Sequence, residues 1–235
     1  MFFDYTYLVL VLPAVLLAMW ASARVHSTFR RYQGQLSRRR ITGADAARAV
    51  LNANGLSDVR IERVSGSLTD HYDPRDNVIR LSDSVYGDTS TAAIGVAAHE
   101  AGHAIQYAVN YAPIRFRAAI IPITNLGSKL AMPLVLIGLI FMSYGQMFVN
   151  VAYLGIACFA LAVLFQLVTL PTEFNASRRA LAAIEAGHLL DEEELAGARK
   201  TLSAAAMTYV AALAVSLAQL FRLILLVAGG RGRRE

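Results

Sequence analysis

Residues 118–170 read AAIIPITNLGSKLAMPLVLIGLIFMSYGQMFVNVAYLGIACFALAVLFQLVTL, and this stretch decides the fold. Its residues are almost all apolar, and its main break is the run Ser143-Tyr144-Gly145-Gln146, which has the composition of a turn. Each half is long enough for a helix that crosses a hydrocarbon layer of about 30 Å. We therefore predict two antiparallel membrane spans, 118–143 and 147–170, which return the chain to the face that it left.

Apolar segments flank this hairpin on both sides. Residues 5–23 form one and residues 204–228 the other, so we predict further spans at 1–23 and 204–228. The chain of 235 residues is 56% hydrophobic and 17% charged, which is too apolar for a soluble domain. An alternative for the first segment is a cleaved signal peptide, but its leading residues carry Asp4 and no lysine or arginine.

Basic residues cluster directly after the first span. The cluster consists of Arg24, Arg30, Arg31, Arg38, Arg39 and Arg40. Because the hairpin turn 143–150 has no basic residue, the positive-inside tendency places the cluster on the cytoplasmic face. We therefore expect a multi-pass protein of the cell (inner) membrane with residues 24–117 and 171–203 in the cytoplasm, although the basic tail 229–235 would then lie outside. The cluster favours membrane lipid as a partner and not nucleic acid, since no aromatic stacking pattern accompanies the arginines.

The polar part of residues 24–117 has the pattern of a small α+β region. The expected elements are a helix over 42–54, strands over 59–64 and 77–81 separated by the turn-forming Asp73-Pro74-Arg75-Asp76, and a helix from a cap at Asp88 or Thr89 to about Tyr107.

That last helix contains the motif His99-Glu100-Ala101-Gly102-His103. Histidines four positions apart point from one face of a helix, so both imidazoles can bind one zinc ion. Glu100 lies on an adjacent side, where its carboxylate can act as general base toward a metal-activated water. The single cysteine, Cys158, lies in an apolar run, so any metal must use histidine and carboxylate ligands. The alternative is a chance spacing in an alanine-rich helix.

A catalytic zinc ion usually holds three protein ligands, and Glu173 is the predicted third. Two spans separate His103 from Glu173, so both residues are expected at the same membrane face. We expect Pro171 to open the helix that carries Glu173. The alternative role of Glu173 is to stabilise the dipole of that helix. Asn175 and Ser177 are candidates to hydrogen-bond the metal ligands. The alternative is that both are solvent-exposed helix residues without such a role.

Several motifs occur together along the chain. They are His-Glu-Ala-Gly-His-Ala-Ile-Gln at 99–106, Glu-Phe-Asn-Ala-Ser-Arg-Arg-Ala at 173–180, Asp-His-Tyr-Asp-Pro at 70–74, Val-Ile-Arg-Leu-Ser at 78–82 and Ala-Arg-Lys at 198–200. Together with the first span, this set resembles the bacterial YugP-like membrane neutral zinc metallopeptidases. The resemblance implies one zinc ion per chain bound by His99, His103 and Glu173, with Glu100 as catalytic base for peptide hydrolysis near the membrane.

A more distant similarity is to the membrane heat-shock and prenyl-protein proteases. In those enzymes an aspartate stands four positions after the glutamate that is the third ligand. Ser177 occupies that position here, so the similarity supports the zinc ligands but not a matching role for Ser177.

Weaker signals concern substrate binding. An edge strand that pairs with an extended substrate is predicted from Asn77, Val78, Ile79, Arg80 and Leu81. An ordinary hairpin strand would have the same pattern. His71 is a further candidate to contact substrate, with a surface histidine as the alternative. Tyr209 could donate a hydrogen bond to an oxyanion, although anchoring at the membrane interface is the commoner role. His188, near a helix end, is not expected to be a ligand.

The sequence predicts a mainly α membrane protein with about four transmembrane helices and a small α+β, zincin-like HExxH region at the membrane face. The predicted function is a membrane-integrated zinc metalloendopeptidase for peptides or proteins, membrane proteins included; the oligomeric state is not predicted. One alternative is a non-proteolytic zinc-binding scaffold or regulator, which would not need Glu100. Another is a small transporter with Asn125, Lys129 and Arg222 on a polar path, which leaves the spacing of the histidines unexplained.

Overall fold

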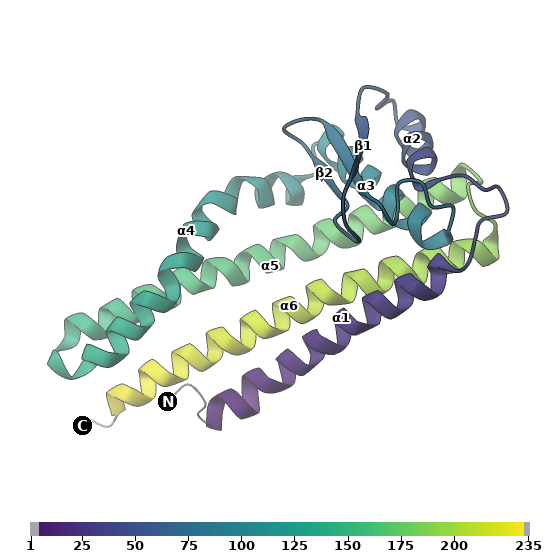
Figure 1. Ribbon diagram of the computed structural model, residues 1–235. Coiled ribbons are helices and arrows are strands. Elements are labelled where there is room, and N and C mark those ends of the chain that lie inside the picture. The colour runs from purple at the N-terminus through teal and green to yellow at the C-terminus, as the bar shows by residue number, and fades with distance from the viewer. Residues whose placement is uncertain (1–4, 233–235) are drawn as a thin grey trace. The chain divides into compact units, whose positions relative to one another are not determined.

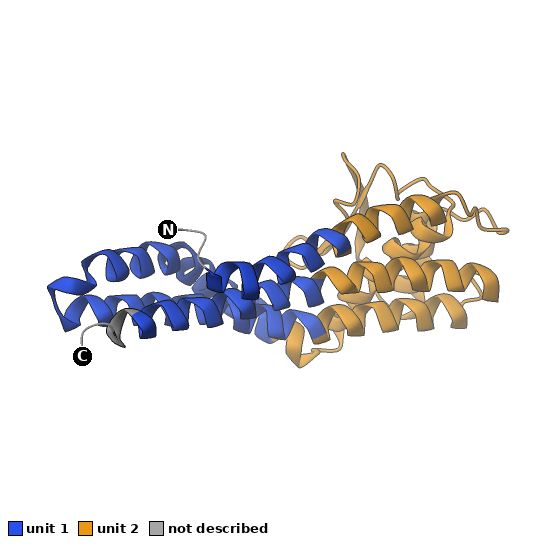
Figure 2. Ribbon diagram, turned by 90° about the horizontal axis from the view of Figure 1, so that it is seen from below, with its two compact units in different colours: residues 1–20, 116–170, 209–235 blue, residues 21–115, 171–208 orange. Residues whose placement is uncertain are grey.

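The computed structural model describes residues 5–232 and divides the chain into two compact units. Unit 1 comprises residues 1–20, 116–170 and 209–235, and unit 2 comprises residues 21–115 and 171–208 (Figure 2). The boundaries between the units fall within long helices, so each of these helices contributes residues to both units.

Four long helical segments dominate the described part of the chain (Figure 1). They are built from η1 (Tyr7–Val11) with α1 (Leu12–Gln33), α4 (Ala112–Phe141) with η2 (Met142–Tyr144), α5 (Gln146–Ala186), and α6 (Glu192–Gly232). Each contains a stretch that is long and apolar enough to cross a membrane. A small three-stranded sheet accompanies them. This architecture confirms the predicted fold class, a mainly α membrane protein with a small α+β region.

Unit 1 is held together by close contact between α4 and α5. A Cβ atom at Gly138 would lie 2.5 Å from Ala152, and a Cβ atom at Gly155 would lie 2.7 Å from Val135 N. Glycine at these two positions therefore lets the two backbones approach each other, as small residues do between membrane helices. The turn between the helices contains Gly145, whose φ of 143° lies outside the range that other residues readily adopt.

The long helices do not end where the apolar sequence ends. Pro171 lies inside α5 and does not open a new helix, so this prediction was wrong. Likewise α6 begins at Glu192, before the apolar stretch that starts at 204. The residues beyond each apolar stretch are rich in alanine and other good helix formers, so the helix continues after the hydropathy falls. Where the membrane boundaries lie along these helices stays a prediction.

The helix that carries the histidines is α3 (Thr91–Ala108), and its N-cap is Ser90. The hydroxyl of Ser90 accepts a hydrogen bond from Ala93 N at 3.2 Å. The prediction that Asp88 or Thr89 would cap the helix was therefore wrong by one or two residues. Asp88 supports the cap instead, because its Oδ1 atom accepts a hydrogen bond from Ser90 N at 2.7 Å.

The sheet consists of β1 (Arg60–Val64), β2 (His71–Asp73) and β3 (Val78–Ser82) in the order β1-β3-β2. The central strand, β3, is parallel to β1 and antiparallel to β2. The prediction that residues 77–81 form an edge strand was therefore wrong. The backbone of residues 78–80 is paired on both sides, so a substrate strand cannot add to it. The short β2, which carried no strand signal in the sequence, covers that edge.

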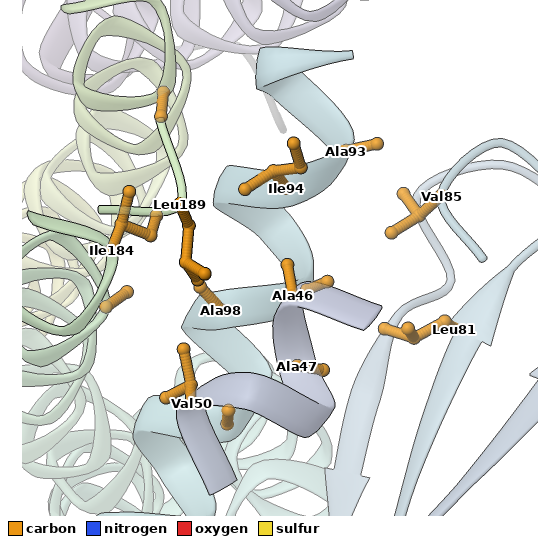
Figure 3. Packing of buried hydrophobic residues seen from close by; sticks show 14 of the residues in the cluster. Ala46, Ala47, Val50, Leu81, Val85, Ala93, Ile94, Ala98, Ile184 and Leu189 are labelled. Carbon is orange, nitrogen blue, oxygen red and sulfur yellow. The ribbon is translucent and has the colours of Figure 1, made fainter. Parts of the chain in front are cut away.

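The core of unit 2 surrounds α3 (Figure 3). The helix α2 (Gly43–Ala53) packs against it and is fixed at its start by a capping box between Thr42 and Asp45. Further buried contacts come from Leu81 of β3, from Val85 in the turn after β3, from Ile184 of α5 and from Leu189 just after α5. Most buried positions of α3 are alanine or glycine. Neighbouring helices can therefore approach its backbone closely.

Gly102 marks the closest of these approaches. A Cβ atom at this position would lie 2.6 Å from the backbone oxygen of Ala176 in α5. Since real Cβ atoms do not come that close to a backbone oxygen, only glycine allows α3 and α5 to pack as they do. Ala176 itself is fully buried in this contact.

We expect Gly102→Ala to destabilise the protein by about 1–3 kcal/mol, because the added methyl group overpacks two backbones that cannot move cheaply. Alanine also favours helix by about 1 kcal/mol over glycine, so the steric cost must exceed that gain. Thermal unfolding in detergent measures the difference. The control is Gly229→Ala, a change in α6 where nothing lies within 4 Å of the new Cβ atom. Equal melting temperatures for Gly102→Ala and the wild type would contradict the packing argument.

Candidate metal centre

Three side chains converge in unit 2, His99 and His103 from α3 and Glu173 from α5. The Glu173 Oε2 atom lies 3.3 Å from His99 Nε2 and 3.5 Å from His103 Nε2. Ligand atoms at about 2.0–2.1 Å from a tetrahedral zinc ion are about 3.4 Å apart. The separations therefore fit a zinc ion bound between the three groups. Two imidazoles and one carboxylate also leave a fourth position open, as in catalytic zinc sites.

The two histidines are placed by helix geometry. They are one turn apart on α3, and their ring centroids are 4.7 Å apart with an interplanar angle of 85°. The rings therefore do not stack, and both Nε2 atoms can face Glu173. Glu173 reaches them because α5 is pressed against Gly102, between the two histidines in the sequence.

A chain of hydrogen bonds fixes the tautomer of the neutral His103 ring. The Gln106 Nε2 atom donates to the Thr172 carbonyl oxygen at 2.8 Å and to Asn175 Oδ1 at 3.0 Å. A carbonyl oxygen can only accept, so the orientation of the Gln106 amide is determined. Its Oε1 atom must then be the group that faces His103 Nδ1 at 3.0 Å. His103 therefore donates from Nδ1 and keeps a lone pair on Nε2 for a metal.

Asn175 extends this chain to Arg179. The Asn175 Oδ1 atom accepts hydrogen bonds from Gln106 Nε2 and from Arg179 Nε, the second at 2.8 Å. An arginine can only donate, so the Asn175 amide is oriented as well. Gln106 is fully buried, which makes each of these bonds costly to lose. The prediction that Asn175 would hydrogen-bond a ligand directly differs from the geometry, in which Asn175 acts on His103 through Gln106.

Ser177 contacts the other histidine directly. Its Oγ atom lies 3.1 Å from His99 Nδ1. A hydroxyl can donate or accept, so this contact holds the ring but does not by itself fix the tautomer. It is the kind of contact that orients a ligating imidazole.

Negative charge surrounds His103. Burial lowers the pKa of this imidazole, but the hydrogen bond to Glu173 and the charges of Glu100 and Glu173 together raise the pKa above its ordinary value. In the absence of a metal, the site therefore attracts a proton. A buried carboxylate such as Glu173, which is only 3% exposed, needs a positive partner. A divalent cation would satisfy the same need.

Glu100 is held by the sheet. Its Oε2 atom accepts a hydrogen bond from the backbone N–H of Tyr72 in β2 at 3.0 Å. This contact uses one carboxylate oxygen and leaves Oε1 for other partners. Glu100 directly follows His99 in the sequence, and the residue is 8% exposed, so it is largely enclosed by its neighbours.

Sequence reasoning missed Gln106 and Tyr72. Gln106 could have been found, because it is a polar residue three positions after His103, on the same face of an otherwise apolar helix. Tyr72 contributes only its backbone N–H to Glu100, so its side chain gave no signal.

The other three histidines of the described chain lie elsewhere, and His26 is an exposed residue of α1. The exposed His71 is held by its own loop, with its Nδ1 atom 2.9 Å from the Thr69 carbonyl oxygen. His188 is exposed just after α5. None of the three is part of the group around Glu173. Roles in substrate binding for His71 and in oxyanion binding for Tyr209 stay predictions.

We expect Gln106→Leu to weaken zinc binding about 10- to 100-fold, because His103 loses the acceptor that fixes its tautomer. Competition with a chromophoric chelator measures the affinity on detergent-purified protein. Gln146→Leu is the matched control, since it makes the same chemical change at an exposed residue at the start of α5. An unchanged affinity in Gln106→Leu protein that melts like the wild type would show that Gln106 does not support the site.

Comparison with known proteins agrees with this geometry. A family model described as "Putative neutral zinc metallopeptidase" matches residues 7–228. The chain is 44% identical over 225 residues to the "Putative membrane protease YugP" of Bacillus subtilis (strain 168), a match that covers 96% of this chain and 98% of that protein. No solved structure matches the chain. The predicted resemblance is thereby confirmed, and the chain belongs to the family described as "Putative neutral zinc metallopeptidase".

Proposed function

We propose that this protein is a membrane-integrated, zinc-dependent metalloendopeptidase. The observation that carries the proposal is the convergence of two imidazole Nε2 atoms on one buried carboxylate oxygen, at 3.3 and 3.5 Å. A structural zinc site is usually closed by four protein ligands, whereas His99, His103 and Glu173 leave one position open. The membership of the chain in the family described as "Putative neutral zinc metallopeptidase" supports zinc as the metal.

Zinc supplies the Lewis-acid part of the proposed reaction. When bound, it activates a water molecule for attack and stabilises the negative charge that develops on the peptide carbonyl oxygen. The residues of the chain orient the groups that bind the metal. Gln106 keeps the proton of His103 on Nδ1, so the Nε2 lone pair of His103 stays available for the metal. Ser177 holds the ring of His99.

Glu100 is the proposed general base. The Tyr72 N–H holds its Oε2 atom, so Oε1 is the atom that takes the proton from the attacking water. The same atom then delivers the proton to the leaving amine. The hydrogen bond from β2 limits rotation of the carboxylate, so Oε1 keeps one position for both proton transfers.

The proposed setting is the cell membrane, with the active site on its cytoplasmic side. Support for this side comes from the arginine cluster after the first span and from the positive-inside tendency. Candidate spans precede and follow the zinc-binding residues along the chain. Substrates close to the bilayer, such as membrane proteins or tethered peptides, are therefore the proposed class.

The test is cleavage of an unfolded protein by the detergent-purified chain, with Glu100→Gln as the variant. Glutamine has nearly the same shape but cannot take a proton, so we expect at least a 100-fold loss of cleavage with the zinc content unchanged. A chelator should abolish wild-type cleavage, and added zinc should restore it.

Glu185→Gln is the control, because it makes the same change at an exposed residue near the end of α5. Cleavage by Glu100→Gln protein at the wild-type rate would refute the role of Glu100. Bound zinc without cleavage of any substrate by the wild type would favour the alternative of a non-proteolytic zinc-binding scaffold.

A further inference from the structure

A cleft of about 360 Å³ lies in unit 2, between α1 and α6 and apart from the metal centre. Its polar lining includes Arg24, Thr28 and Arg31 of α1 with Lys200 and Ser203 of α6. Among the described residues, no carboxylate lines it. The cleft therefore combines three cationic side chains with hydroxyl groups, and neither acidic nor metal-binding groups are among its lining residues.

The cationic residues of α1 share one helix face. Arg24, Thr28 and Arg31 follow the spacing i, i+4 and i+7, so their side chains leave the helix in the same direction. At the helical rise, they extend over about 10 Å along the axis. Lys200, Ser203 and Met207 of α6 follow the spacing i, i+3 and i+7 and supply the facing wall.

Tyr32 fixes the two walls relative to each other. A Cβ atom at Gly197 would lie 2.9 Å from Tyr32 Cδ1, so the ring lies directly against the α6 backbone. The Arg31 Cζ atom is 5.7 Å and the Lys200 Nζ atom 6.0 Å from the centroid of this ring. Two cations from different helices are thus held around one side chain. Because the two like charges repel each other, binding of an anion that contacts both cations would be favourable.

The chemistry of the lining selects a phosphate group. Guanidinium and ammonium groups with nearby hydroxyls are the donors that bind phosphate oxygens. The helices α1 and α6 are both candidate membrane spans, and Ala204 and Met207 give the cleft an apolar part. A ligand with a phosphate and an attached apolar chain would match both parts.

We propose that this cleft binds the phosphate of an anionic phospholipid from the surrounding membrane. Free phosphate offers the same charge but nothing for Ala204 and Met207 to contact. The site is separate from the zinc ligands, so the proposal does not depend on the peptidase activity.

The experiment uses the only tryptophan of the chain, Trp20. It lies one helical turn before Arg24 on α1, about 6 Å along the axis. The full-length protein is reconstituted into vesicles of phosphatidylcholine and phosphatidylglycerol, with bromine on the acyl chains of one lipid at a time. Quenching of Trp20 by each lipid then gives the preference of its surroundings for the anionic lipid.

We expect the wild type to prefer phosphatidylglycerol and each of Arg31→Gln and Lys200→Gln to lower that preference by up to about fivefold. Matched controls are Arg30→Gln and Arg199→Gln, which remove the same charge from the neighbouring residues outside the cleft lining. The controls should keep the wild-type preference. Thermal unfolding verifies that each variant is folded.

Three results would overturn the proposal. The first is a wild type without preference for phosphatidylglycerol. The second is an equal fall in preference for the cleft variants and their controls, which would mean that only the diffuse charge of the surface attracts the lipid. The third is loss of the preference when inorganic phosphate is added in excess, which would assign the cleft to the free anion.

Discussion

The contact of α3 with α5 at Gly102 is the constraint on which the metal centre depends. A backbone oxygen of α5 lies where the side chain of any other residue would be. This contact sets the distance between the helix that carries both histidines and the helix that carries Glu173. The ligand separations of 3.3 and 3.5 Å follow from it, because a shift of α5 by the width of a methyl group would move Glu173 out of reach.

The same helix contact also supplies the groups that orient the ligands. Asn175 and Ser177 lie on either side of Ala176, and each begins a path to one histidine, Asn175 through Gln106 and Ser177 directly. Glu100 is oriented from the other side, by the backbone of β2. The small sheet therefore contributes to the site by fixing the proposed base through β2. It does not offer its central strand to a substrate, because that strand is paired on both edges.

The convergence of His99, His103 and Glu173 could be predicted because it depends on simple geometry. The spacing of His99 and His103 follows from the helical repeat, and Glu173 follows from the count of membrane spans between it and His103. The ends of α5 and α6 could not be predicted in this way. Hydropathy indicates where a segment is apolar enough for lipid, whereas the helix continues as long as the residues favour helix.

The sheet was harder to predict because β2 has only three residues and no alternating pattern. Because β2 pairs with residues 78–80, β3 is the central strand and not an edge strand. No feature of the β3 sequence itself indicates this. The position of Gln106 three residues after His103 indicates that the two side chains can meet. Its role in orienting His103, however, depends on Thr172 and Asn175 in another helix. Contacts of this kind depend on the packing of α3 against α5, which the sequence pattern of either helix alone does not contain.

The most direct measurement of the central claim is X-ray absorption at the zinc edge on the purified, zinc-loaded protein. Binding by His99, His103 and Glu173 predicts a shell of nitrogen and oxygen at about 2.0–2.1 Å, with multiple scattering from two imidazoles. His103→Ala should leave scattering from one imidazole. A sulfur neighbour, or wild-type scattering from any other number of imidazoles, would contradict this assignment of the metal centre.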